Sequence, residues 1–472
     1  MSTRRPILGA LIPVLLTAWV FGGGVAGASG TSPAVAIPTN VNVSRMLGNQ
    51  AETSIAISQT HPKKMTIVSN IDVGDGLFHG WSTDSGTTWN TEVIADGDAL
   101  GFACCDPSLA SDEFGNIFLA YLSSSIVVKV ALSTDGGATF SPLAAAAASG
   151  GSSNAPGRRL GRLPGGDQPS VTAGHGAVWV TWTGSGGVIQ AAGAPVTGQG
   201  QIGAFSTPQS VQGSNNHGDY GDIAIGPNGQ IFVAYQYPTG GEGPATIYGS
   251  LDADGLGAGG FSQAKQILVT NVGGFDYIPA QSGRSVDAET ELAWDRTGGP
   301  HSGRLYLLFT SEQPQESNDM DIQVQHSEDN GSTWTSPVRV NDDTTTTRSQ
   351  FNPRIALDPT TGNLAVAWYD CRKDKGNHHF GDTNGIPNDD ITIWGSYSTD
   401  GGGTFTPNRR ISQGVSNDDD AANGVDYGDY EGLAFYGGKY FYAWADNSNS
   451  TGDNPDGTLS RLDVYTAKVR VP

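Results

Sequence analysis

A short pattern, S-x-D-x-G-x-T followed by Trp or Phe, occurs four times in this chain. The copies span residues 82–89 (STDSGTTW), 133–140 (STDGGATF), 327–334 (SEDNGSTW) and 398–405 (STDGGGTF). In each copy the aspartate can accept hydrogen bonds from a tight turn, the glycine can adopt a conformation that a Cβ would resist, and the aromatic ring can pack over the hairpin. The pattern therefore indicates a repeat protein with four structural aspartates. They are Asp84, Asp135, Asp329 and Asp400.

A second repeating element precedes these copies. It consists of a hydrophobic residue followed by Ala, a turn that contains Gly, and a second hydrophobic stretch that ends in an aromatic residue, as in GDIAIGPNGQIFVAY. Seven such units occur, and their first aliphatic residues, which we call the anchors, are spaced by 52 to 78 residues. The anchors are Ile55, Leu109, Val171, Ile223, Leu292, Ile355 and Leu433. Degenerate copies of the turn pattern remain at Ser250 to Phe261 and near Phe205.

The units predict short antiparallel strands. Apolar residues alternate inside each unit, and no helical period is sustained. A blade of four such strands cannot bury both faces alone, so consecutive blades must stack around an axis and close. We predict an all-β fold, a seven-bladed β-propeller, with six blades as the alternative. The segment from Thr39 to Arg45 is expected to supply the closing strand of the last blade.

The N-terminal segment has the features of a signal peptide. Arg4 and Arg5 precede an apolar run from Ile7 to Val20, and Ala26 to Ala28 has the small-x-small form of a cleavage site. We therefore predict a secreted protein, extracellular or periplasmic, and no later stretch approaches the roughly 20 apolar residues of a membrane span. The expected organisation is a signal peptide at 1–28, a flexible segment at 29–38, and one propeller domain at 39–472 with a flexible insertion at 144–165.

The net charge limits the possible binding partners, and the number of cysteines limits the possible disulfide bonds. The formal net charge of −22 argues against nucleic acid as a partner, and we expect a monomer. The three cysteines are an odd number, so in an exported chain at least one is unpaired or pairs between molecules. Two intramolecular arrangements are open: Cys371 bonded to Cys104 or Cys105, or a vicinal bond between Cys104 and Cys105.

Polar residues stand directly before the anchors, where the innermost strands of a propeller start at one mouth of the channel. Each anchor has a polar or aromatic residue three positions before it. These residues are Glu52, Asp106, Gln168, Tyr220, Glu289, Asn352 and Tyr430. Neighbouring positions add Asp167, Asp219, Asp222, Glu291, Arg354, Asp429 and Glu431, and the string WYDCR adds Asp370 and Arg372. So many carboxylates in one place must protonate in part, bind a cation or be neutralised by arginine. We take this mouth as the candidate site, with Asp219, Asp370 and Glu431 among its substrate-binding residues.

The turn pattern is the Asp-box, and the chain resembles the sialidase superfamily. The strings CCDP, GDY and WYD-x-R are similar to those of secreted bacterial proteins labelled sialidase-like or exo-alpha-sialidase. The resemblance implies a glycoside hydrolase acting on extracellular glycans. By chain order it implies Asp106 as acid/base, Glu291 as the carboxylate that partners a tyrosine, and Tyr430 as the nucleophile. It also implies that Arg354 and Arg372 hold the substrate carboxylate.

The chain departs from the sialidase pattern in two respects. No Arg-Ile-Pro motif precedes the first Asp-box, and seven units occur where six blades are the sialidase norm. A polysaccharide lyase or another glycosidase on the same scaffold, and a non-catalytic propeller that binds glycan or protein, are therefore the alternatives. Three guanidiniums beside a Tyr and a Glu would favour sialidase, paired carboxylates another hydrolase, and a fully self-neutralised rim a binding module.

Three loops contain the oxygen ligands that a hard cation such as Ca²⁺ prefers. They are Gly381 to Asp390 (GDTNGIPNDD), Asn417 to Asp420 (NDDD) and Gly452 to Gly457 (GDNPDG). None has EF-hand spacing, so the sequence predicts solvated turns there. The histidines form no zinc-binding pattern. We therefore expect no cofactor and no metal, with Ca²⁺ as the one cation to consider.

Overall fold

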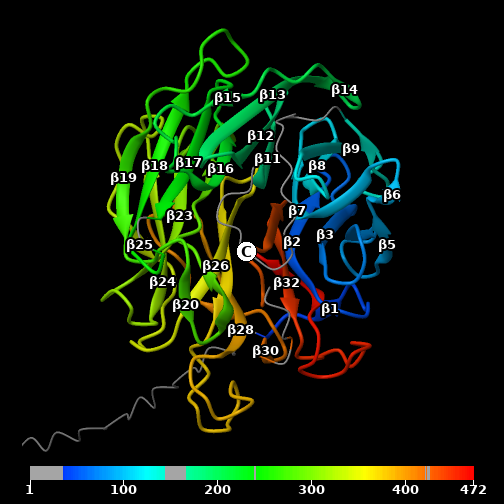
Figure 1. Ribbon diagram of the computed structural model, residues 1–472, viewed down its shortest axis with the longest axis vertical. Coiled ribbons are helices and arrows are strands. Elements are labelled where there is room, and N and C mark those ends of the chain that lie inside the picture. The colour runs from blue at the N-terminus through cyan, green and yellow to red at the C-terminus, as the bar shows by residue number, and fades with distance from the viewer. Residues whose placement is uncertain (1–35, 144–165, 239–240, 420, 422–425) are drawn as a thin grey trace, which may run out of the picture. The chain divides into compact units, whose positions relative to one another are not determined.

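The computed structural model describes residues 36–143, 166–238, 241–419, 421 and 426–472. Residues Ile37–Pro472 form one compact unit, which is all-β: seven small antiparallel sheets in a ring make a seven-bladed β-propeller (Figure 1). The predicted fold class and the number of blades are confirmed. The predicted signal peptide at 1–28 and the insertion at 144–165 lie outside the described residues. Among the described residues, no helix is long and apolar enough to cross a membrane.

The blades follow one another along the chain, and each begins with one of the predicted units. Blade 1 contains β2 (Gln50–Ile57), β3 (Met65–Ile71), β4 (Leu77–Ser82) and β5 (Asn90–Ile94). Blade 2 contains β7 (Gly101–Ser111), β8 (Ile117–Ser123), β9 (Val128–Ser133) and β10 (Ser141–Pro142), with β6 (Asp96–Asp98) beside β7. Blade 3 contains β11 (Asp167–Gly174), β12 (Ala177–Gly184), β13 (Val188–Gly198) and β14 (Gln201–Ile202), with β15 (Gln209–Ser210) beside β13.

Blade 4 contains β16 (Asp219–Ile225), β17 (Ile231–Pro238), β18 (Ala245–Asp252) and β19 (Lys265–Thr270). A hairpin of β20 (Asp276–Ile278) and β21 (Gln281–Val286) follows. Blade 5 contains β22 (Glu291–Trp294), β23 (Leu305–Glu312), β24 (Met320–Ser327) and β25 (Val338–Arg339). Blade 6 contains β26 (Gln350–Leu357), β27 (Leu364–Asp370), β28 (Asp390–Ser398) and β29 (Arg409–Arg410), with β30 (Ser416–Asn417) beside β28. Blade 7 contains β31 (Gly432–Tyr436), β32 (Lys439–Asp446), β33 (Asp463–Arg470) and β1 (Asn40–Asn42).

The two ends of the propeller close the ring in the last blade. The first strands β2, β7, β11, β16, β22, β26 and β31 pack against one another in that order, and β31 packs against β2. The N-terminal strand β1 pairs antiparallel with β33, with Asn40 opposite Ala467. Asn42 donates a side-chain hydrogen bond of 2.6 Å to Asp463. The predicted closing strand is confirmed.

Each complete Asp-box follows the third strand of its blade, after β4, β9, β24 and β28. In the box that follows β28, one oxygen of Asp400 accepts the Thr404 N–H at 2.9 Å and the other accepts the Thr404 hydroxyl at 2.6 Å. Gly402 takes a φ of 80°, a conformation that a residue with a Cβ resists. The aspartates therefore hold turns, as predicted, and take no part in the channel.

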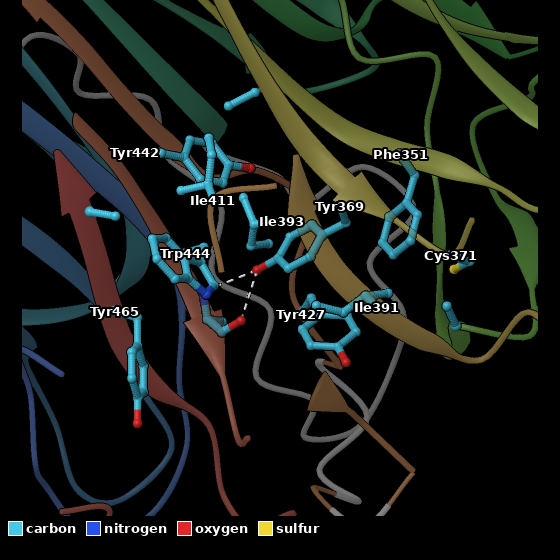
Figure 2. Close-up of a cluster of buried hydrophobic side chains, with 14 of the residues drawn as sticks. Phe351, Tyr369, Cys371, Ile391, Ile393, Ile411, Tyr427, Tyr442, Trp444 and Tyr465 are labelled. Atoms are coloured by element: carbon cyan, nitrogen blue, oxygen red, sulfur yellow. Dashed lines mark hydrogen bonds between the residues drawn. The ribbon is translucent and has the colours of Figure 1, made fainter. Parts of the chain in front are cut away.

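The cores lie between neighbouring blades. An aromatic cluster joins blades 6 and 7, and Figure 2 shows Tyr369, Tyr427, Tyr442 and Trp444 within it. The rings of Tyr369 and Tyr427 are 4.7 Å apart. The Tyr369 hydroxyl receives the Ala445 N–H at 3.0 Å, so its polar atom is satisfied inside the apolar layer. Such packing holds the innermost strands, and hence the channel side chains, in fixed positions.

Candidate functional site

The residue three positions before the anchor has left-handed backbone in six of the seven blades. Its φ angle is 55° at Glu52, 58° at Asp106, 47° at Gln168, 45° at Tyr220, 44° at Glu289 and 45° at Asn352. Register shifts interrupt the first strand pair at the same place in several blades. Such β-bulges change the direction in which a side chain points, so these residues no longer follow the alternating pattern of the strand. We call these six residues the bulge belt.

Neighbouring members of the bulge belt are linked across blades. The Gln168 N–H donates to the Asp106 carboxylate at 3.1 Å, and the Tyr220 N–H donates to the Gln168 side chain at 3.3 Å. In several blades, the side chain one residue before the anchor also joins neighbouring blades. There the Leu292 N–H donates to Asp222 at 2.7 Å, for example. The strained backbone is therefore held by hydrogen bonds from the adjacent blade.

Nine carboxylates and two guanidiniums interact in this part of the channel, which we call the acid layer. The carboxylates are Glu52, Asp106, Asp167, Asp219, Asp222, Asp287, Glu289, Glu291 and Asp429. Arg284 forms ion pairs with Asp429 and with Glu52, the latter at 3.2 Å. Arg354 forms an ion pair with Glu291. The acids outnumber the cations, so the layer either keeps protons or is strongly negative.

Several of these acids keep their protons at neutral pH. Burial raises the pKa of Glu52 to about 8, although Arg284 lowers it. Burial also raises the pKa of Asp106, and raises that of Asp167 well above its usual range. Asp106 and Asp167 share a side-chain hydrogen bond, which favours the proton on Asp167. The two form a carboxylate pair that holds one proton between them.

Glu291 is in a different electrostatic position. Burial raises the pKa of its carboxyl group, and the Arg354 guanidinium opposes that rise. A guanidinium does not lose its proton in proteins, so at least one acid beside Arg354 must be ionised. Glu291 is the acid in direct contact with it. We therefore take Glu291 as ionised.

A small pocket opens between these groups. Its volume is about 50 Å³, room for a few water molecules but not for a sugar ring. The Tyr430 hydroxyl lines it and has no hydrogen-bond partner among the described residues. Burial, followed by the charges of Asp106 and Glu52, raises the pKa of Tyr430 well above its usual range. Tyr430 is therefore a neutral phenol.

The anchors themselves line the neighbouring stretch of the channel. All seven surround a cavity of about 290 Å³ whose side chains are mostly aliphatic. Arg296 also reaches it, and its guanidinium donates to the Ala173 carbonyl at 3.3 Å. The channel thus carries charged side chains in the acid layer and mostly aliphatic side chains in the layer of the anchors.

Five of the eight predicted site residues come together in the acid layer. Glu291, Arg354 and Tyr430 line the 50 Å³ pocket. Asp106 acts electrostatically on Tyr430, and Asp219 acts on Asp167. These five residues, which the sequence analysis singled out, therefore lie in one layer of the channel.

The other three lie elsewhere. Arg372 donates to Asp370 at 2.8 Å and to Asp342 at 2.7 Å, and it stacks on the Trp394 ring at 4.2 Å, within the outer part of blade 6. Asp370 is fully buried and also accepts the Trp368 indole N–H. These contacts make the Asp370–Arg372 pair part of the blade packing.

Glu431 is likewise a structural residue. Its side chain is fully buried and accepts hydrogen bonds from the hydroxyls of Thr53 and Tyr369 and from the Ala445 N–H at 3.1 Å. It thereby connects blade 7 with blades 1 and 6.

Arg284 is the main site residue that the sequence analysis missed. It belongs to the β20–β21 hairpin, which has no counterpart among the described strands of the other repeat units. Blade 7 holds this hairpin, because the N–H groups of Gly283 and Arg284 both donate to Asp426 at 2.7 Å. The Gln281 side chain also donates to the Gly428 carbonyl at 2.9 Å. The one available signal was an arginine five residues before the rim position Glu289.

The structure shows which of the two possible disulfide arrangements is present. Cys104 and Cys105 form a vicinal disulfide directly before Asp106. Cys371 is a buried free thiol. The bond joins the two residues that precede a member of the bulge belt, so it restricts the backbone that aims Asp106.

No family model matches the sequence, and no curated protein matches it. Among solved structures, the chain is similar to the GH93 alpha-L-arabinofuranosidase of Fusarium graminearum in complex with arabinobiose, with 14% identity over 71% of this chain and 92% of that chain and a TM-score of 0.43. The BP39L lectin from Burkholderia pseudomallei shares 12% identity over 77% of this chain and 84% of that chain, with a TM-score of 0.47. The Hadza microbial sialidase Hz136 shares 14% identity over 89% of this chain and 66% of that chain, with a TM-score of 0.43. These distant likenesses concern the propeller fold and leave the activity to be argued from the site.

Proposed function

We propose that this chain is a secreted glycoside hydrolase that acts on extracellular glycans at the acid layer of its channel. One observation carries the proposal: a proton-holding carboxylate pair, Asp106 and Asp167, lies in the same layer as the arginine-bound Glu291. Hydrolysis of a glycosidic bond uses one protonated and one ionised carboxyl group on either side of the bond. Environments that separate the pKa values of neighbouring acids mark such roles.

The proposed roles follow from the protonation states. The Asp106–Asp167 pair protonates the departing glycosidic oxygen, because its proton is retained at neutral pH. Glu291 stabilises or attacks the anomeric carbon, or activates a water for that attack. Arg354 is a positioning residue that keeps Glu291 ionised.

The sugar would lie over the acid layer rather than inside it. The 50 Å³ pocket admits only water or a single substituent of the sugar. The Arg284 side chain is 29% exposed and Asp429 is 9% exposed, so this ion pair faces any ligand that enters from solvent. Its donors and acceptors suit sugar hydroxyl groups.

An exo-alpha-sialidase is the second candidate. The observation that favours it is the convergence of Tyr430, Glu291 and Arg354 on one pocket, with Asp106 nearby. Against it, Arg284 and Arg354 are both already paired with acids, and Arg372 is bound within blade 6. An excess of carboxylates also repels a sugar that carries a carboxylate. We therefore place a non-anionic sugar first.

A substrate panel tests the proposal. The purified mature chain is offered 4-methylumbelliferyl glycosides of neutral pyranoses and furanoses, the sialic acid glycoside, and uronic-acid polysaccharides. Turnover of a neutral glycoside supports the first candidate, and turnover of the sialic acid glycoside alone supports the second. Double-bond formation in the polysaccharides would indicate a lyase. Glycan-array binding without turnover of any substrate would contradict a hydrolase and leave a binding propeller.

A further inference from the structure

A second group of acids lies away from the channel, where the loop between β27 and β28 returns to blade 6. Oxygen atoms of Asp374, Asp389 and Asp390 all lie within 4.8 Å of one another. The three residues are 0%, 3% and 1% exposed. This compact group, which we call the aspartate triad, sits at the border of the aromatic cluster. Figure 2 shows Ile391, the next residue in the chain, together with Cys371 in that cluster.

Backbone and side-chain contacts fix the shape of the aspartate triad. Asp374 accepts the N–H groups of Asp389 at 2.9 Å and Asp390 at 3.1 Å, which folds the loop back on itself. Asn384 donates to one oxygen of Asp389 at 2.7 Å, and the Thr383 hydroxyl donates to Asp390 at 2.6 Å. The carboxylates are therefore preorganised on a closed loop.

The other oxygen of Asp389, Oδ1, receives no hydrogen bond from an N–H or hydroxyl group of the described residues, although Asp389 is only 3% exposed. The carboxyl groups of Asp389 and Asp374 interact directly, so without a cation they would have to share a proton. Asp418, which follows β30, is equally buried, and neither of its oxygens has a partner there. The pairing of β30 with β28 sets Asn417 opposite Asp390, and the charges of Asp418 and Asp389 act on each other. Unsatisfied carboxylate oxygens of Asp389 and Asp418 thus occur on two neighbouring segments whose charges interact.

Among the residues that the structure describes, no cationic side chain pairs with these charges. Within the described ranges, none of Asp374, Asp389, Asp390 and Asp418 forms an ion pair with Lys, Arg or His. An uncompensated buried charge costs on the order of several kcal/mol. Folding therefore requires either protons on these groups or a bound cation.

We propose that the aspartate triad, together with Asp418, binds one Ca²⁺ ion. Carboxylate oxygens are its preferred ligands, and its variable coordination suits an irregular loop. Mg²⁺ fits less well because it retains several waters, for which a site this buried leaves little room. The triad contains no His or Cys ligand, which argues against Zn²⁺. The ion would fasten the β27–β28 loop to β30 and so stabilise blade 6.

The assignment also distinguishes among the three acidic loops of the sequence. Residues 381–390 and 417–420 both supply acids to this place, whereas the triad includes no acid from residues 452–457. Asp453 in the third loop is exposed, which makes it a matched control for substitution.

The test uses the full mature chain, stripped with EDTA and then dialysed into chelator-free buffer. Thermal unfolding is recorded with no addition, with CaCl2 and with MgCl2, and bound calcium is measured by atomic absorption. We expect one Ca²⁺ per chain and, at about 100 times the dissociation constant, a rise in Tm of roughly 3 to 5 °C. The same concentration of Mg²⁺ should give a smaller rise.

Two variants complete the test. Asp389→Asn should lose the calcium-dependent rise in Tm but keep the Tm of the stripped wild type or exceed it, because one buried charge is removed. Asp453→Asn should keep the full response. If stripped wild type binds no calcium and its Tm is unchanged by CaCl2, the acids are balanced by protons and the proposal is wrong. An equal loss of response in both variants would also overturn the assignment to the triad.

Discussion

Arg284 balances more buried charge than any other single side chain of the acid layer. Its guanidinium contacts Asp429 through both carboxylate oxygens and also contacts Glu52. These carboxylates are 9% and 2% exposed. Loss of the guanidinium would leave two acids in a poorly solvated position. Such an uncompensated charge costs more than the ion pair itself contributes.

The substitution Arg284→Ala should therefore destabilise the protein by about 3 kcal/mol. Lys63→Ala is the control, because Lys63 is an exposed cation that forms no ion pair among the described residues. That change should cost less than about 1 kcal/mol. Urea unfolding measures both values. Equal losses in the two variants would show that Arg284 has no special role.

Some side chains of the channel could be located from the sequence, and others could not. Alternation around the anchors placed Asp106, Glu291 and Tyr430 at one end of the innermost strands. Arg372, which the string WYDCR suggested, lies outside the acid layer, because it donates to an acid two positions away within its own blade. Arg284 escaped notice because its hairpin stands outside the repeat. The repeat spacing reveals only the residues that the blades have in common. The charge balance of the acid layer depends on Arg284, which comes from a hairpin that, among the described strands, is present between two blades only.

The Asp-box recurs in four of the seven blades, and its aspartate has the same role in each of the four. Asp84 accepts the N–H groups of Thr87 at 3.0 Å and Thr88 at 2.9 Å, and also the Thr88 hydroxyl at 2.7 Å. Hydrogen bonds from the Thr88 backbone and side chain lower the pKa of Asp84 to about 2. The turn is thus stabilised by an ionised acceptor.

The change Asp84→Ala should reduce the free energy of unfolding by about 1 to 3 kcal/mol, because several hydrogen bonds to one charged acceptor are lost. Asp75→Ala, at an exposed loop residue of the same blade, should change it by less than about 0.5 kcal/mol. Denaturant unfolding at pH 7 provides the comparison. A loss at position 84 no larger than at position 75 would mean that the box does not stabilise the blade.

The closing strand β1 is the second element with a measurable role. It supplies the fourth strand of blade 7 and brings Val43 into the core. A chain that begins at residue 46 should lose this strand, and its Tm should fall by more than about 5 °C relative to a chain that begins at residue 37. Differential scanning calorimetry of the two chains measures the difference. An unchanged Tm would contradict closure of the ring by β1.

The whole molecule combines acids whose pKa values are shifted in opposite directions. Burial raises the pKa of Glu431 to about 8 from 4.5, and that of Asp276 to about 8 from 3.8. Between the unfolded and the folded pKa, these groups are protonated in the folded chain but ionised in the unfolded chain. The free energy of unfolding therefore falls as pH rises toward 8. The pKa of Asp84 is shifted downward, so this residue lowers the free energy of unfolding as pH falls from 3.8 toward 2.

Stability should therefore be greatest near pH 4 to 5, between the two windows. Thermal unfolding across the pH range, in buffers that contain EDTA, should show Tm falling from pH 5 to pH 8.5. The chelator removes any stabilisation by bound cations, which would otherwise mask the trend. A Tm that is constant or rises over this range would show that the buried acids are ionised in the folded protein.

The propeller as a whole could be predicted because its repeats are visible along the chain. Seven anchors gave seven blades, and the missing last Asp-box correctly indicated the strand Asn40–Asn42 as the closure. The aspartate triad could not be predicted in the same way. Its acids come from a loop without repeat spacing, and only folding brings Asp374 against Asp389. Local patterns thus defined the scaffold, and contacts between irregular loops defined the chemistry.

Asp106→Asn and Tyr430→Phe, compared on the best substrate of the panel, test whether the carboxylate pair supplies the proton for hydrolysis. We predict that Asp106→Asn lowers kcat/KM by about 10² to 10⁴, the usual contribution of general-acid catalysis, because it breaks the Asp106–Asp167 pair that holds the transferable proton. Tyr430→Phe should retain activity within about tenfold, because the phenol is neutral and makes no hydrogen bond among the described residues. Loss of turnover in Tyr430→Phe with activity retained in Asp106→Asn would contradict the carboxylate mechanism.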